Sequence, residues 1–275
     1  INKLIVGFDY TITGHAYKCT DCPENSTNEL FDHFQVSTLA GQIYTYSGAG
    51  DCQSHDGPLN WPNGLAVDSL GNVYVADMCN HRIRMIDISG NISTFAGTGT
   101  PGAKNGYRTE AQFNAPRDVI IDSSENLYIV DANNGQIRKI DTSGNVTKIA
   151  SGFRYPHGGA VDSNGNFFVA DTYQHRIVRI DSLGNATTIA GQFGEKGFNN
   201  GKGEEALFAF PMDVVIDDIG NVYVSDYQNY VIRKIETTGY VSTLAGSGDR
   251  GHSDGNGFSS SFDSPSGLAI DSIGN

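Results

Sequence analysis

Apolar and polar residues alternate along most of the chain in short runs, which is the period expected of half-buried β-strands. The stretch that begins at Pro62 shows the pattern clearly, because four such runs follow one another and are separated by segments rich in Gly, Asn, Asp and Ser. The runs cover residues 64–68, 73–77, 82–87 and 92–96. Gly and Asn adopt the positive φ angles that hairpin turns need. The pattern therefore predicts one antiparallel sheet of four strands.

The same unit recurs along the chain. Prolines at 62, 116, 156, 211 and 265 each begin a similar stretch, such as PNGLAVDSLGNVYVAD at 62 and PMDVVIDDIGNVYVSD at 211. The spacings are 54, 40, 55 and 54 residues, so one unit lacks an inserted loop. A single sheet cannot bury both faces, whereas units packed side by side around an axis can. The period predicts an all-β propeller of four-stranded blades, because a linear β-solenoid would repeat over fewer residues.

The most complete unit, residues 62–97, reads P-x-G-L-A-V-D-S-x-G-N-V-Y-V-A-D-x-x-N-H-R-I-R-x-I and ends in G-N-I-S-T-F-A-G. This motif resembles the NHL repeat, and the resemblance covers residues 42–275. The glycine-rich lead-in loops at 97–116 and 246–265 are similar to insertions of extracellular and bacterial NHL proteins. The resemblance implies a β-propeller, and a fold alone does not define a function.

The repeats predict a single propeller domain, residues 1–275, with irregular ends. Residues 61–263 hold four complete repeats, and residues 264–275 supply the first strand of a last or closing blade. Residues 1–60 fit a degenerate first blade with a cysteine-containing insertion. Five blades can be counted, and a strand at residues 4–8 that pairs with the C-terminal strand would close that ring. We favour six blades, the number that the family resemblance implies.

Composition and charge exclude several partner classes. The 34 glycines among 275 residues fall mainly in hairpin turns and lead-in loops, so they do not indicate disorder. A net charge of −13 opposes contact with polyanions, and eight of the 18 basic residues lie in the third strands, so we expect no nucleic-acid binding. No apolar run approaches the ~20 residues of a membrane span, so no membrane insertion is expected.

The four cysteines favour an oxidising compartment. Cys52 and Cys79 lie in loops that the propeller places on one face, and Cys19 and Cys22 lie in an insertion expected on the same face. We interpret them as two disulfides, with unpaired thiols or a zinc site as alternatives.

Glycosylation motifs point to the same compartment. N-x-[ST] sequons occur at Asn25, Asn91, Asn145 and Asn185. The last three also fit ordinary turn chemistry, because each follows a glycine, whereas Asn25 lies outside the repeats. We therefore expect an extracellular or cell-surface glycoprotein.

Two sets of aspartates recur in every unit. The first set ends the first strand of each unit: Asp68, Asp122, Asp162, Asp217 and Asp271. The second set ends the second strand: Asp77, Asp131, Asp171 and Asp226. Residues common to all blades are normally structural, so we expect the first set to accept turn amides and the second to meet an arginine of the next strand. That arginine is present at 84, 138 and 233 and is replaced by Val178 in the third unit.

Function is expected where the repeats differ. The residue after each lead-in proline varies, as does the residue before it; the resemblance places both at the mouth of the central channel. The candidate binding residues there are Asn63, Arg117, His157, Met212, Ser266, Trp61, Tyr155 and Phe210. Such a mixed polar and aromatic ring suits a ligand or a partner segment. The alternative is that Trp61, Tyr155 and Phe210 only pack beneath the loops.

Some relatives implied by the resemblance are metal-dependent lyases or lactonases, which use zinc or calcium. His157 is at the channel mouth, and His55 and His252 lie in loops that could reach it. No spacing fixes the three together, and no P-loop, G-x-S-x-G or H-E-x-x-H motif is present. We therefore predict a non-catalytic module without a cofactor that binds a protein or glycan, or assembles with itself. The alternative is a metal-dependent lyase or hydrolase.

Overall fold

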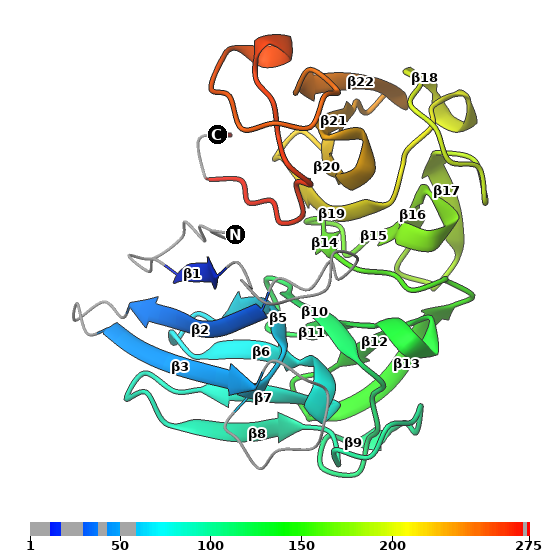
Figure 1. The fold of residues 1–275 in the computed structure, drawn as a ribbon. Helices are drawn as coiled ribbons and strands as arrows, with labels where there is room; N and C mark the ends of the chain where they lie inside the picture. The colour runs from blue at the N-terminus through cyan, green and yellow to red at the C-terminus, as the bar shows by residue number, and fades with distance from the viewer. Residues whose placement is uncertain (1–11, 18–29, 38–42, 50–58, 272–273) are drawn as a thin grey trace.

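The computed structural model describes residues 12–17, 30–37, 43–49, 59–271 and 274–275, with side chains from residue 59 onward. Within these residues the regular elements are β-strands and single turns of 3-10 helix. Four blades follow one another around an axis, from cyan through green and yellow to orange (Figure 1). The first strands of successive blades contact one another, which places them at the centre of the propeller.

Each blade is an antiparallel meander whose four strands lie at the positions that the repeat predicts. The first blade contains β5 (Pro62–Val67), β6 (Val73–Asp77), β7 (Arg82–Ile86) and β8 (Ile92–Ala96). The second contains β10 (Pro116–Ile121), β11 (Leu127–Asp131), β12 (Gln136–Ile140) and β13 (Asn145–Ser151). The third contains β14 (Gly159–Val161), β15 (Phe167–Asp171), β16 (Arg176–Ile180) and β17 (Ala186–Ala190). The fourth contains β19 (Pro211–Ile216), β20 (Val222–Asp226), β21 (Val231–Ile235) and β22 (Tyr240–Ala245).

Two blades carry a fifth strand that the sequence pattern does not reveal. The lead-in loop of the second blade forms β9 (Gly106–Tyr107), which pairs with the outer strand β13. The loop of the fourth blade forms β18 (Gly201–Lys202) in the same way against β22. The inserted loops therefore cover the outer edges of their own blades.

A further sheet precedes the first blade. Its strands are β1 (Ile12–Tyr17), β2 (Leu30–Ser37), β3 (Ile43–Ala49) and β4 (Leu59–Asn60). The first three are antiparallel, and β4 runs parallel to β3. The predicted strand at residues 4–8 lies outside the described residues, so ring closure through it stays a prediction.

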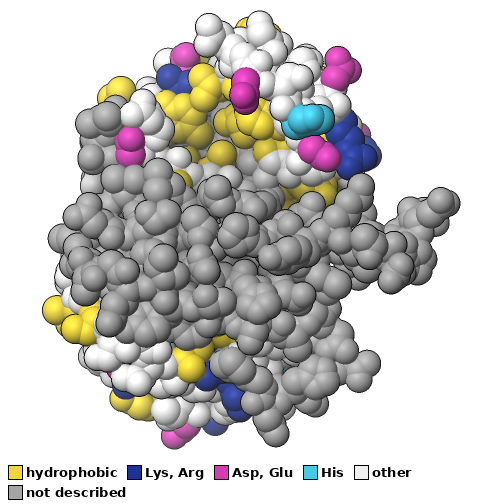
Figure 2. Space-filling model, turned by 60° about the vertical axis from the view of Figure 1, so that its left-hand side comes forward, with side chains coloured by type: hydrophobic (Ala, Val, Ile, Leu, Met, Phe, Trp, Pro, Cys, Tyr) yellow, Lys and Arg dark blue, Asp and Glu magenta, His cyan; other side chains and the backbone are white. Residues whose placement is uncertain are grey.

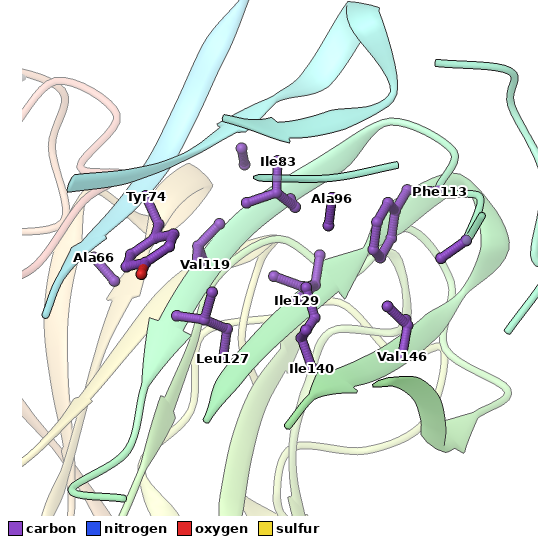
Figure 3. Close-up of a cluster of buried hydrophobic side chains, with 12 residues drawn as sticks. Ala66, Tyr74, Ile83, Ala96, Phe113, Val119, Leu127, Ile129, Ile140 and Val146 are labelled. Atoms are coloured by element: carbon purple, nitrogen blue, oxygen red, sulfur yellow. The ribbon is translucent and has the colours of Figure 1, made fainter. Parts of the chain in front are cut away.

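The hydrophobic core lies between neighbouring blades. Ile83 and Ala96 of the first blade pack with Val119 and Ile129 of the second (Figure 3). Phe113 comes from the lead-in loop and is fully buried in the same cluster. Packing between blades thus buries the sheet faces that one blade alone would expose.

A turn of 3-10 helix joins the second and third strands of each blade. The four turns are η1 (Met78–Asn80), η2 (Ala132–Asn134), η3 (Thr172–Gln174) and η5 (Tyr227–Asn229). Each is followed by a residue with left-handed backbone: His81, Gly135, His175 or Tyr230. No helix of the described residues has the length and apolar character of a membrane span.

Candidate functional site

The recurring aspartates are structural, as predicted. Asp68 accepts the backbone N–H of Leu70 at 3.0 Å and of Asn72 at 2.7 Å, which closes the turn between β5 and β6. The corresponding turns contain Asp122, Asp162, Asp217 and Asp271. Burial raises the pKa of Asp122, but hydrogen bonds from the side chain and backbone of Asn126 and the N–H of Ser124 outweigh it and lower the pKa.

The second set of aspartates is completely buried. Asp131 accepts the N–H of Asn114 at 2.7 Å and Nη1 of Arg138 at 2.9 Å, so it ties the approach to β10 to the middle of the blade. The predicted arginine partners are confirmed at three positions: Arg84, Arg138 and Arg233. In the third blade, where Val178 replaces the arginine, Nε of Arg176 lies 2.9 Å from Asp171 instead.

Two of these arginines also hold the lead-in loops. Arg138 donates to the carbonyls of Gln112 and Lys104, each at 3.0 Å, and to Oδ1 of Asn105 at 2.7 Å. Arg233 makes the corresponding bonds in the fourth blade, to the loop residues Leu207, Asn199 and Asn200. The third blade has no long lead-in loop, so an arginine at position 178 would lack these acceptors. Val178 is therefore explained by the short link.

The residue before each lead-in proline has left-handed backbone. The φ angles are 52° at Trp61, 50° at Ala115, 51° at Tyr155, 55° at Phe210 and 57° at Ser264. This conformation is unfavourable for residues with a side chain, so it must be held by the surrounding contacts. Nδ1 of His81 accepts the N–H of Ala115 at 3.0 Å, and Nδ1 of His175 accepts that of Phe210 at 3.2 Å. Both histidines are scaffold residues, as predicted, and burial lowers their pKa values, which favours the neutral acceptor form.

The second blade has Gly135 where the first and third have these histidines. A Cβ at Gly135 would lie 2.3 Å from the carbonyl oxygen of Phe153, and its φ of +58° also favours glycine. This close approach exists because the link from the second to the third blade is short and passes directly over η2. No other blade junction within residues 59–271 has this arrangement.

A pocket opens at this junction, where the long loop and the histidine are both missing. Its volume is about 480 Å³, and it is lined by residues of η2, the short link and η3: Ala132, Asn133, Asn134, Gly135, Phe153, Arg154, Tyr155 and Tyr173. The rings of Tyr155 and Tyr173 meet edge to face with centroids 5.4 Å apart, and Tyr173 meets Phe210 at 5.3 Å. Sequence reasoning missed the pocket, although the short spacing and Gly135 were its visible signals.

Three predicted channel-mouth residues come together beside the pocket. Arg117 donates from Nη2 to the hydroxyl of Tyr155 at 2.8 Å, and its Nη1 lies 2.7 Å from Nε2 of His157. The guanidinium carbon also lies 4.8 Å from the centre of the Tyr155 ring. Because arginine is always a donor, Nε2 of His157 must be the acceptor.

The other predicted mouth residues do not join this group in any described contact. Trp61 packs against Met78, Cys79 and Ala115, which is the packing role given as the alternative. The backbone carbonyl of Met212 accepts a hydrogen bond from the N–H of Gly158. The backbone carbonyl of Ser266 accepts one from the hydroxyl of Ser225. Asn63 is exposed. Binding roles for these residues stay predictions.

Known proteins share both the repeats and the fold. A family model described as NHL repeat matches residues 59–84 and 153–180. NHL repeat-containing protein 2 of Bos taurus is 34% identical over 96 residues, which cover 34% of this chain and 13% of the relative. An auxiliary nutrient binding protein from Bacteroides ovatus superposes with a TM-score of 0.67 at 15% identity, over 96% of this chain and 72% of that chain.

The chain belongs to the NHL-repeat β-propeller family.

Other matches to this NHL propeller differ in function. The protein SUPPRESSOR OF QUENCHING 1, chloroplastic, of Arabidopsis thaliana is 31% identical over 255 residues, or 81% of this chain. The match spans 24% of that relative, so the NHL propeller corresponds to about a quarter of it. A virginiamycin B lyase from Staphylococcus aureus has a TM-score of 0.55 at 15% identity, over 78% of this chain and 63% of that chain. Likeness at this identity extends to the fold alone.

A metal site at the channel mouth gains no support from the described side chains of the NHL propeller. No three His, Cys, Asp or Glu residues among them are placed to hold an ion. The Nε2 lone pair of His157 faces the Arg117 guanidinium, a cation that would repel a metal. His252 is exposed, and His55 lies outside the described residues.

One of the four cysteines and three of the four sequons lie within the described residues. Cys79 is buried in η1 and disulfide-bonded, while Cys19, Cys22 and Cys52 lie outside the described residues, so the pairing stays a prediction. Asn25 also lies outside them. Asn91, Asn145 and Asn185 are exposed, and each donates its side-chain amide to the aspartate four residues earlier. These three sequons therefore have the turn role that was given as their alternative explanation.

Proposed function

We propose that this NHL propeller is a non-catalytic module that binds a protein segment or a small ligand such as a glycan at the junction between its second and third blades. The pocket over η2 carries the proposal. It combines the edges of two tyrosine rings with the polar side chains of Asn133, Asn134 and Arg154, a mixture suited to sugars and peptides.

The outer edges of the second and fourth blades are poorer candidates for binding or self-assembly. β9 and β18 already pair with the outer strands of two blades, and covered edges resist further strand pairing. On the face drawn in Figure 2, the described side chains mix hydrophobic, acidic and basic types rather than forming one basic patch. This supports the expectation that nucleic acid is not the partner.

A pair of matched tyrosine variants tests the proposal. Tyr173 is 44% exposed in the pocket, and Tyr240 is 47% exposed on β22 of the fourth blade. Peptide and glycan arrays are probed with the unaltered protein, Tyr173→Ser and the control Tyr240→Ser. We expect the unaltered protein and Tyr240→Ser to bind the same set of peptides or glycans, and Tyr173→Ser to lose this binding. Absence of any bound feature at about 100 µM protein, or equal binding by all three, would contradict the proposal.

We also propose that the complete ring has six blades. The second residue after each lead-in proline alternates around the axis: Gly64, Asp118, Gly158, Asp213 and Gly267. A Cβ at Gly64 would collide with Oδ1 of Asp118, and one at Gly158 would lie 2.2 Å from Oδ1 of Asp213. Each aspartate therefore fills the space beside the glycine of the preceding blade.

The same aspartates accept a hydrogen bond from the following blade. Oδ2 of Asp118 accepts the N–H of Gly159, and Oδ2 of Asp213 accepts the N–H of Leu268. Residues 264–271 form no strand, yet Leu268 thus has the contact that Gly159 makes as an inner-strand residue. A five-blade ring would place Gly267 beside Gly64, whereas a sixth blade with an aspartate continues the alternation. An electron cryomicroscopy map of the whole protein that shows five blades would exclude this arrangement.

We propose an extracellular or cell-surface location for this NHL propeller. The disulfide-bonded Cys79 and the sequon at Asn25 support it, whereas the name of the plant relative carries the word chloroplastic. Mass spectrometry of the native protein without reduction should find the cysteines paired and a glycan at Asn25. Four alkylated thiols and an unmodified Asn25 would refute the location.

A further inference from the structure

Arg117 is a partly buried cation with no anionic partner among residues 59–271. Its guanidinium contacts the neutral hydroxyl of Tyr155 and the acceptor nitrogen of His157. Its Nε is buried and has no hydrogen-bond partner. None of the ion pairs of the described residues includes it, whereas the buried Arg138 and Arg233 each face a carboxylate. A charge withdrawn from water without a counter-charge costs free energy, so a buried arginine is normally paired with an anion.

The neighbouring acids are engaged elsewhere. Asp118, next in the chain, accepts the N–H groups of Val119 and Gly159 and is 3% exposed. Asp131 and Asp171, which directly precede η2 and η3, pair with Arg138 and Arg176. The other charges beside the tyrosines are cationic, because Arg154 lies 6.0 Å from the Tyr173 ring centre and Lys196 lies 5.6 Å from that of Phe210. The junction is thus locally positive in a protein of net charge −13.

Donors without acceptors accumulate at this point. The Tyr155 hydroxyl oxygen accepts from Arg117, which leaves its own hydrogen available to a second group. A guanidinium has five N–H donors, of which the contacts with Tyr155 and His157 use two. An anionic oxygen could therefore accept from Arg117 and Tyr155 together, while the aromatic rings of Tyr155, Tyr173 and Phe210 offer an adjoining apolar surface.

We propose that the junction recognises a carboxylate carried next to an apolar or aromatic group, such as an acidic or C-terminal peptide residue, with Arg117 and Tyr155 as the groups that bind the carboxylate. This assignment rests on the proposed binding function and specifies the ligand class. Arginine suits the task because its planar donors match the two oxygens of a carboxylate.

The test uses N-acetylphenylalanine and its neutral amide as probes. Chemical-shift perturbation in ¹⁵N-labelled protein, including the arginine Nε–H signals, gives the two affinities. We expect the carboxylate to bind at least about tenfold more tightly than the amide. Arg117→Gln should abolish that preference, Tyr155→Phe should weaken it, and the control Arg179→Gln, an exposed residue of β16, should leave it within twofold. Equal binding of the two probes, or an unchanged preference in Arg117→Gln, would overturn the proposal.

Further outcomes distinguish the carboxylate assignment from the proposed binding function. Inorganic phosphate is the second anionic probe, and tighter binding of phosphate than of N-acetylphenylalanine would overturn the assignment to a carboxylate. Array binding that depends on Tyr173 but is indifferent to carboxylates would refute the ligand class alone. A carboxylate preference that depends on Arg117, found without any array binding, would support the anion site and contradict the binding of peptides and glycans in the pocket beside Tyr173.

Discussion

Replacement of Arg233 by valine tests the claim that buried aspartate–arginine pairs hold the lead-in loops. Arg233 is fully buried, lies 2.8 Å from Asp226, and donates to loop residues Leu207, Asn199 and Asn200. Burial raises the pKa of Asp226 to about 6 although Arg233 opposes it, so Arg233→Val removes the counter-charge of a buried carboxyl group and raises this pKa further. Breaking such a pair costs about 3–5 kcal/mol, out of a stability of about 5–15 kcal/mol.

The third blade supplies a matched rescue. There, Val178 occupies the position of Arg233, and Arg176 pairs with Asp171 and donates to Thr188. In the fourth blade, Val231 occupies the position of Arg176, and Thr243 occupies that of Thr188. The double variant Val231→Arg/Arg233→Val therefore copies the arrangement of the third blade. We expect it to recover part of the lost stability, because Asp226 regains a cation. The loop should stay unanchored, because the acceptors of Arg233 have no donor.

Urea unfolding at pH 8 and limited trypsin digestion give the two readouts. With a denaturant slope of about 3 kcal/mol/M, Arg233→Val should lower the midpoint by about 1–1.7 M. Trypsin should cut faster at Lys196 and Lys202 of the loop in both variants, and the exposed control Arg179→Val should match the unaltered protein. A loss below about 1 kcal/mol for Arg233→Val, or a double variant no more stable than the single, would refute the reasoning.

Three further substitutions test other parts of the scaffold. Gly135→Ala should destabilise the protein by about 1–3 kcal/mol, measured by urea unfolding, because its Cβ would meet the Phe153 carbonyl and its φ is positive; an unchanged midpoint would show that the short link can move away. Gly158→Ala should destabilise by at least about 2 kcal/mol through contact with Asp213, whereas Gly165→Ala, where nothing lies within 4 Å, should cost less. Asp122 and Asp217 should make the protein acid-labile: a folded-state pKa below the unfolded value of about 3.9 gives stability that is present above that value and lost as pH falls through the folded pKa. Asp122→Asn should therefore flatten the loss of stability between about pH 4 and pH 2 in urea titrations, and an unaltered acid limb would contradict this assignment.

The repeat was predictable from the sequence because its causes are local. Strand alternation, turn residues and the pairing of Asp131 with Arg138 depend on contacts within one unit. The candidate site depends instead on contacts between units. Residues before proline favour extended backbone, so the left-handed φ of Tyr155 and Phe210 could not be foreseen, nor could the ring contacts that follow from it.

Three separate sequence features produce the pocket at the junction between the second and third blades. The link before the third blade is short, Val178 replaces the arginine that would bind loop carbonyls, and Gly135 replaces the histidine that would fill the space beside η2. A deletion of the loop alone would have left buried N–H groups of an arginine at position 178 without the loop oxygens that accept them, which is destabilising. Because Val178 removes that penalty and Gly135 admits the direct passage of Phe153, the pocket is stable without a loop. The blade that departs furthest from the repeat is therefore the place where a ligand can reach the aromatic cluster.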